Sequence, residues 1–183
     1  MSLFARIVRC TARLRRDRSG VSAVEFAILA PVMLTLFLGS VEATQGIAAD
    51  RKVELTAHTL ADLSSQYTNI ADLDMANILA AGSAILAPYP TSGLQEVVSE
   101  IAINNQGAGT VVWSDTLGGT ALTVGSTVSI PSALAVPNTY LVLAQVKYSY
   151  NPAYGFVMTG SISLSDQSFM QPRESNSIAR TAL

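Results

Sequence analysis

The chain has 183 residues, of which 49% are apolar and only 13% charged. This length allows one modest domain plus a membrane segment, and the charged content is well below the roughly 25% of typical soluble domains. Six of its eleven basic residues lie in the first 20 positions, so the chain from Val21 onward carries 5 basic and 12 acidic residues, a net charge of −7. A basic head on an acidic body argues against a nucleic-acid-binding protein and favours a topology signal at the N-terminus.

Histidine and cysteine are too scarce for a metal centre or a catalytic set. Cys10 is the only cysteine, which excludes an intrachain disulfide and a thiolate metal site. His58 is the only histidine, and it falls at i, i+4, i+8 spacing with Glu54 and Asp62 on a predicted helix, a pattern typical of a solvated face. We therefore expect no catalytic residue, no cofactor, no metal ligand and no enzyme activity.

An uncharged segment of membrane length follows the basic head. Residues 26–41 contain no charge, and with the residues back to Val21 the segment reaches 21 residues, close to the roughly 20 that cross a hydrocarbon core. Positive charge lies almost wholly on its N-terminal side, and the residues closest to the segment are Arg13, Arg15, Arg16 and Arg18. The positive-inside rule predicts a single-pass protein with a cytoplasmic N-terminus and the rest of the chain across the membrane.

Three kinds of N-terminal segment fit this pattern. The first is a secretory signal peptide cut between Ala43 and Thr44, and the second is an uncleaved signal anchor. The third is a prepilin leader, cut on the cytoplasmic side after Gly20. A twin-arginine signal is disfavoured, because Asp17-Arg18-Ser19 stands where apolar residues normally follow a pair such as Arg15-Arg16.

Glu25 favours the prepilin interpretation. A carboxylate costs about 2.5–3.5 kcal/mol at the centre of a membrane helix and less near the interface, and neither a signal peptide nor an anchor has a use for one. After cleavage at Gly20 the new amine of Val21 is positive, and Glu25 of a neighbouring subunit can neutralise it inside an apolar bundle. Because buried charges need partners, this pair would also fix the axial register between subunits.

At these residues the chain resembles the TadE-like pseudopilins of the tight-adherence (Tad) pilus. The match is RSG-VSAVEFAILAPVML at positions 18–34, and the stretches at 61–86 and 146–174 resemble the periplasmic part of the alphaproteobacterial branch. The resemblance implies that Gly20 is the last leader residue and Val21 the first mature residue. It also implies assembly roles for Glu25 and Phe26 and does not separate TadE-like from TadF-like members.

The resemblance implies a minor pilin or pseudopilin that takes part in assembly of a Tad-type, type IVb-like pilus. Its implied partners are a prepilin peptidase, the major pilin, other pseudopilins and an inner-membrane assembly platform driven by an ATPase. The implied location is the bacterial inner membrane, with the C-terminal domain in the periplasm and, after assembly, in the extracellular pilus. The alternative is a membrane-anchored or secreted periplasmic binding protein with no role in a pilus.

Four segments are expected along the chain. Residues 1–20 form the basic leader, 21–42 a transmembrane and assembly helix, 43–66 its amphipathic continuation, and 67–183 a periplasmic α+β domain. Pro31 removes one backbone hydrogen bond and predicts a kink, and Gly39 and Gly46 weaken the helix locally. A stripe at i, i+4, i+7 and i+8 should pack on the domain; it consists of Val53, Ala57, Leu60 and Ala61.

The predicted domain combines a short helix with an antiparallel sheet, an α+β, pilin-like fold. Asp72 is expected to cap a helix near 73–86, which Pro88 and Pro90 end. Strands are predicted at 96–103, 110–114, 140–150 and 156–165, with a hairpin turn at 104–107 and another turn that contains Asn151-Pro152 and Gly155. Trp113, Tyr148 and Tyr150 are assigned to the core of the sheet, and the polar end after Pro172 is expected to fray.

Overall fold

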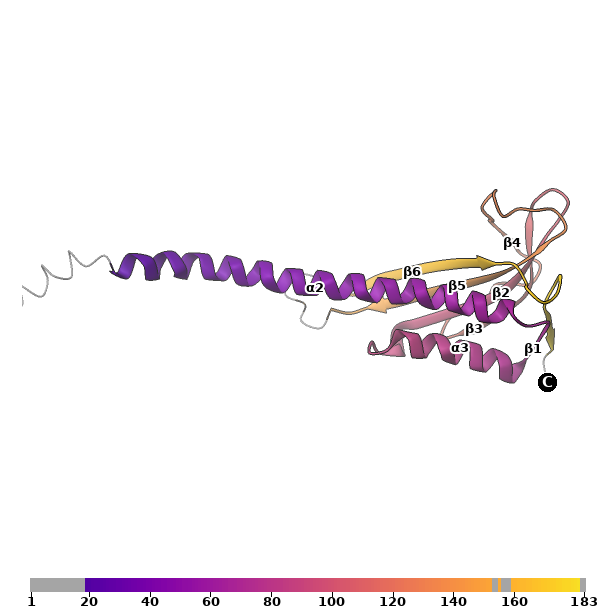
Figure 1. The fold of residues 1–183 in the computed structure, drawn as a ribbon, viewed down its shortest axis with the longest axis horizontal. Helices are drawn as coiled ribbons and strands as arrows, with labels where there is room; N and C mark the ends of the chain where they lie inside the picture. The colour runs from indigo at the N-terminus through magenta and orange to yellow at the C-terminus, as the bar shows by residue number, and fades with distance from the viewer. Residues whose placement is uncertain (1–18, 153–154, 156–158, 182–183) are drawn as a thin grey trace, which may run out of the picture.

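A single long helix dominates the computed structural model, which describes residues 19–152, 155 and 159–181. Helix α2 runs from Ser19 to Ser65, 47 residues, and it continues through Pro31, Gly39 and Gly46. Figure 1 shows it as one extended rod whose second part lies against the folded domain. The kink predicted at Pro31 therefore does not break the helix, and the two helical segments predicted from the sequence form one element.

A short strand and a second helix follow. Strand β1 spans Asn69–Ala71 and helix α3 spans Asp72–Leu86. The cap predicted at Asp72 is wrong by one residue, because Ala71 is the N-cap and Asp72 already lies in the first turn. Asp74 provides the capping contact: its carboxylate accepts a hydrogen bond from the amide of Ala71 at 3.1 Å, and its negative charge suits a helix N-terminus.

Five strands form one antiparallel sheet in the order β4-β3-β2-β5-β6. A short 3₁₀ helix, η1 (Thr91–Gly93), leads into β2. The strands are β2 (Leu94–Ile103), β3 (Gly109–Leu117), β4 (Thr127–Val128), β5 (Tyr140–Tyr150) and β6 (Ile162–Met170). The α+β fold expected from the sequence is confirmed.

The predicted hairpin between β2 and β3 is confirmed. Its turn is closed by the side chain of Asn104, whose Oδ1 accepts hydrogen bonds from the amides of Gln106 and Ala108, both at 2.9 Å. Gly107 has a φ of +80°, a conformation that favours glycine. Asn104 and Gly107, which the sequence indicates as turn residues, therefore determine the connection between β2 and β3.

Strand β6 differs from its prediction. Phe156 and Met158, which were expected on this strand, lie outside the described residues, and the strand begins only at Ile162 and continues to Met170. Gly160, just before it, has a φ of +93°, which does not fit a regular strand. The predicted start at residue 156 was therefore too early for the part that the structure describes, and the predicted end at 165 was five residues short.

The main core lies between one face of the sheet and the two helices. The second half of α2 supplies Val53, Ala57, Leu60 and Ala61, all fully buried, which confirms the predicted stripe. The core also contains Trp113, Tyr148 and Tyr150, as predicted. A small second cluster on the sheet contains Ile101, Val111 and Leu143, against which Phe169 packs.

Strand pairing and core contacts hold the C-terminal end in place, so the expectation that it frays is wrong. Strand β7 (Ala179–Thr181) pairs in parallel with β1, and Ile178 is buried in the main core. Before it, the amide of Arg173 donates to the carbonyl of Ser65 at the end of α2. The last residues therefore connect α2, β1 and the core.

Candidate functional site

The residues expected to carry processing and assembly lie in the first two turns of α2. Gly20, Val21, Glu25 and Phe26 are all exposed, and Phe26 is 70% exposed. A Cβ atom at Gly20 would have no neighbouring atom within 4 Å. The fold itself therefore does not require a glycine at position 20, so a requirement for one has to come from a partner. The expected topology residues, Arg13, Arg15, Arg16 and Arg18, lie outside the described residues.

The N-terminal half of α2 presents apolar side chains on every side. Ten large apolar residues between positions 21 and 37 are more than half exposed, including the consecutive residues Val32, Met33 and Leu34. The segment belongs to a helix that is long and apolar enough to cross a membrane. Its most apolar 18 residues have a mean hydropathy of 2.1, and the protein buries none of them. A helix that is apolar all round needs an apolar medium on all sides.

Two hydroxyl groups of this segment, those of Thr35 and Ser40, form hydrogen bonds within the helix. Thr35 donates to the carbonyl of Pro31 at 2.9 Å, and Ser40 donates to the carbonyl of Phe37 at 2.7 Å. Such back-bonding removes the need for water or for a partner helix to pair these hydroxyls. Both residues are therefore compatible with an apolar surrounding.

The domain begins to hold the helix directly after the apolar segment. Glu42 is only 1% exposed, whereas Val41 is half-buried. One turn later, the carbonyl of Gln45 accepts a hydrogen bond from the hydroxyl of Tyr89 at 3.1 Å. The ring of Tyr89 meets the ring of Tyr150 edge to face, with centroids 5.9 Å apart. No loop or linker therefore separates the apolar segment from the domain.

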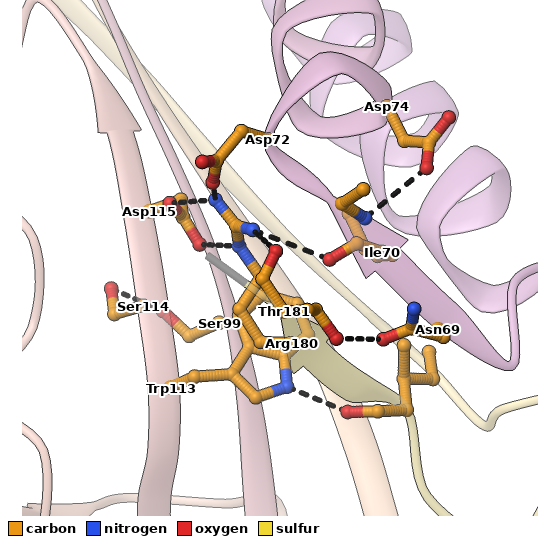
Figure 2. Close-up of polar contacts among 12 residues, drawn as sticks. Asn69, Ile70, Asp72, Asp74, Ser99, Trp113, Ser114, Asp115, Arg180 and Thr181 are labelled. Carbon is orange, nitrogen blue, oxygen red and sulfur yellow. Dashed lines mark hydrogen bonds and ion pairs between the residues drawn. The ribbon is translucent and has the colours of Figure 1, made fainter. Parts of the chain in front are cut away.

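Arg180 holds the far end of the domain together (Figure 2). Its guanidinium donates to both carboxylate oxygens of Asp115 at 2.8 and 3.1 Å and to Asp72 at 2.6 Å. A further bond reaches the carbonyl of Ile70 at 3.2 Å. The hydrogen bond to Asp115, followed by that to Asp72, raises the pKa of Arg180 further above its usual value. The cluster joins β7 to α3 and β3, which is a structural role.

Two glutamates on β2 are buried among apolar side chains. Glu100 accepts a hydrogen bond from the amide of Ile178 at 2.6 Å; burial raises the pKa of Glu100, and the bonds to Ile178 and Trp113 oppose that change. Glu96 is fully buried, and neither of its oxygens has a hydrogen-bond partner among the described residues. Burial alone raises its pKa to about 7. Glu96 is therefore neutral at mildly acidic pH, which avoids an unpaired charge in the core.

Analysis of the sequence missed these buried acids and the cluster at Arg180. The signal for Glu96 and Glu100 is their period-2 spacing with Val98, but the alternating set of Val97 and Ile101 fits a buried face equally well. The partners of Arg180 lie 65 and 108 positions away in the chain, so local patterns do not indicate them. Within the described ranges, no group of three His, Cys, Asp or Glu residues could hold a metal ion.

The comparisons with known proteins single out the long helix. Residues 20–62 match the family model described as TadE-like protein, which is nearly the whole of α2. No curated protein and no solved structure matches the chain. The narrower resemblance to the alphaproteobacterial branch stays a prediction. The match confirms the resemblance found in the sequence and supports a TadE-like protein, from a family of pilin-like structural proteins associated with the Tad pilus.

Proposed function

We propose that the chain is a minor pilin or pseudopilin that a prepilin peptidase cuts after Gly20 and that then takes part in assembly of a Tad-type pilus. One observation carries this proposal: a single continuous helix has one half that is apolar and exposed all round and another half that is packed into the domain. The exposed half suits lipid before assembly and an apolar fibre core after it. The packed half makes the domain move with the helix.

Glu25 supports the proposal, because it is an exposed acid in an otherwise apolar surface. Among the described residues it forms no ion pair, and such a carboxylate in lipid costs about 2.5–3.5 kcal/mol at the centre of a membrane helix and less near the interface. Cleavage after Gly20 creates a positive amine on Val21, four residues and about 6 Å away along the helix axis. The amine of a neighbouring subunit, displaced along the axis, would give Glu25 a partner of opposite charge.

The alternative signal-peptide cleavage is less consistent with the packing. Val41, Glu42 and Ala43 lie inside a continuous helix, and the domain buries the side chain of Glu42. A cut before Thr44 would remove this buried residue together with residues 20–43, about half of the segment that matches the family model. No observation on the described residues specifically favours a periplasmic binding protein with no pilus role.

The proposed partners are the peptidase, the major pilin, other pseudopilins and an inner-membrane assembly platform driven by an ATPase. The proposed location is the inner membrane in a single pass, with a cytoplasmic N-terminus that carries Arg13, Arg15, Arg16 and Arg18. The domain from residue 67 onward would lie in the periplasm and, after assembly, in the extracellular pilus. Support comes from the asymmetry of positive charge around the apolar segment.

N-terminal sequencing of the mature protein from cells tests the proposal. We expect the mature chain to start at Val21, and we expect an intact leader when the prepilin peptidase is deleted. A start at Thr44 would indicate a signal peptide, and an intact Met1 in cells that contain the peptidase would indicate an anchor. Either result would contradict the proposed processing.

A further inference from the structure

The apolar segment ends where a bilayer of ordinary thickness would end. Residues 21–41 span about 31 Å at 1.5 Å per residue, and the hydrocarbon core of a bilayer is about 30 Å thick. If Val21 lies at the inner boundary, Val41 lies at the outer one. Glu42 is then at the boundary of the hydrocarbon, where the domain covers its side chain and leaves it 1% exposed.

Tyr89, which lies between α3 and η1, contacts α2 a few ångströms beyond Val41 along the helix axis. Its hydroxyl is 3.1 Å from the carbonyl of Gln45, and Gln45 is four residues, or about 6 Å, beyond Val41. The headgroup layer on each side of a bilayer is about 5–7 Å thick, because the full bilayer measures 40–45 Å and its core about 30 Å. The Tyr89 hydroxyl therefore falls at headgroup depth.

The part of the domain around Tyr89 has the composition of an interfacial surface. We call it the base of the domain and define it as residues 86–93 together with residues 150–152. It contains no charged residue, and Ala87, Pro88, Pro90, Thr91 and Ser92 are exposed. Tyrosines are enriched at membrane interfaces because they combine an apolar ring with a polar tip.

Ion pairs lie toward the opposite end of the domain, whereas beside the base Lys52 of α2 donates to the carbonyl of Ile85 at 2.8 Å. Asp62 and Arg173 form an ion pair near the end of α2, and Arg180 pairs with Asp72 at the start of α3. Helix α3 and strand β2 both extend away from the base toward the opposite end of the domain. Helix α3 ends at Leu86 and strand β2 begins at Leu94, and both residues are at the base. Figure 1 shows the C-terminal end of α3 directed toward the free part of α2. The uncharged base and these ion pairs therefore lie at different ends of the domain.

We propose that the base of the domain rests on the outer headgroup layer of the membrane, with Tyr89 as an interfacial anchor that sets the depth of the helix. This inference rests on the proposed function only in that it needs α2 to be inserted in a bilayer. Tyr150, 3% exposed, supports the Tyr89 ring from inside, and Cε1 of Tyr150 would lie in ordinary contact, 3.9 Å, with a Cβ at Gly46 of α2. The contact holds the subunit against lipid until assembly lifts it away.

Site-specific labelling of the full chain in lipid vesicles tests the contact. In a Cys10→Ser background the chain has no cysteine, so Ser92→Cys places a fluorophore on the base and Ser132→Cys places one at the far end. Both serines are exposed, and β2 separates the two ends by about 30 Å at 3.3 Å per residue. We expect a nitroxide on the lipid headgroup to quench most of the fluorescence at Ser92 and none at Ser132.

Flotation of the same vesicles separates the two levels of the proposal. Protein that fails to float with the vesicles would overturn both membrane insertion and the contact of the base. Protein that floats, but whose label at Ser92 is quenched no more than the label at Ser132, would overturn the contact and leave insertion standing. Protein that floats with selective quenching at Ser92 supports both.

Substitution of Tyr89 tests its role as the anchor. We expect Tyr89→Ala to reduce the quenching at Ser92, whereas Tyr89→Trp should retain it, because tryptophan also prefers the interface. Tyr140→Ala, at the far end of β5, is the matched control and should leave the quenching unchanged. Equal quenching in Tyr89→Ala and in the unsubstituted chain, with both folded by circular dichroism, would overturn the anchoring role.

Discussion

The two halves of α2 belong to one helix but differ in what surrounds them. Between Val21 and Phe37 large apolar side chains are more than half exposed on every side, whereas from Glu42 onward the domain buries an apolar stripe of the helix. Length and composition make both halves helical, but only the pattern around the axis shows what each half contacts. A helix that is apolar all round needs a medium, and a helix with an apolar stripe needs a partner.

The largest effect is expected from the only charge in the apolar half. Glu25→Ala should abolish fibre assembly, because the positive amine of Val21 would be left without its partner in the fibre core. Electron microscopy of cells that express the variant, with immunoblotting for the amount of protein, measures this. Glu54→Ala, an exposed acid in the other half of α2, is the control and should assemble normally. Normal fibres with Glu25→Ala would show that the proposed pair does not form.

Truncation of one leucine in each half should separate the two environments. Leu60→Ala removes a fully buried side chain and should lower the free energy of unfolding of the domain by about 2–5 kcal/mol. Leu36→Ala, at a position that is 70% exposed, should leave it unchanged. Urea denaturation of the full chain in detergent, followed by tryptophan fluorescence of Trp113, provides the measurement. Equal losses for the two variants would contradict the division of the helix.

A pH response is expected at Glu96 of β2, which lies against the helices: a Cβ at Gly82 of α3 would clash with Oε1 of Glu96 and lie 3.0 Å from Thr56 of α2. The folded-state pKa of Glu96 is about 7, above the ordinary 4.5, so the neutral carboxyl favours the folded state. Its stabilising contribution is complete below pH 4.5 and is lost as the pH rises through 7. The loss amounts to about 3 kcal/mol at 1.36 kcal/mol per pKa unit.

Replacement of Glu96 checks this response directly. The difference in unfolding free energy between the unsubstituted chain and Glu96→Gln should change between pH 4.5 and 7, because glutamine does not titrate. Glu54→Gln, on the exposed face of α2, is the control for the loss of a carboxylate outside the core. A difference for Glu96→Gln that stays constant over this range would mean that the carboxyl keeps its ordinary pKa.

A smaller effect is expected at the end of the domain that is far from the apolar half. Arg180→Ala removes a mostly buried guanidinium and leaves Asp115 without its charged partner, and we expect a loss of about 1–3 kcal/mol. Arg173→Ala breaks a more exposed pair with Asp62 and should cost about 0–1 kcal/mol. Thermal unfolding of both variants gives the comparison. A larger loss for Arg173→Ala would reverse the assigned importance of the two pairs.

Local patterns were sufficient where the partners of a residue are close in the sequence or where one side of an element is clearly apolar. The bounds of β5, Tyr140–Tyr150, and the stripe on α2 agree with their predictions because periodicity determines them. The turn after β2 agrees because asparagine and glycine close it. The Gly20 and Glu25 assignments came from a motif, and their roles stay predictions.

Sequence patterns failed where distant parts of the chain cooperate. The end after Pro172 is polar and contains one large apolar residue before position 180, Ile178, so nothing local indicates that it fills a place in the core. The buried positions of Glu96 and Glu100 contradict the usual preference of acids for the surface. For Ile178 and Glu100 the deciding contacts join residues 65 and 78 positions apart.

Helix α2 continues through Glu42 without a break, and this continuity has a mechanical consequence. A force that draws the apolar half out of the bilayer displaces the domain by the same distance, and any rotation of the helix about its axis swings the domain around it. Subunits that enter a fibre can then approach only in those orientations in which neighbouring domains clear one another. The stiffness of one helix thus couples the step by which a fibre grows to the shape of the domain at its surface.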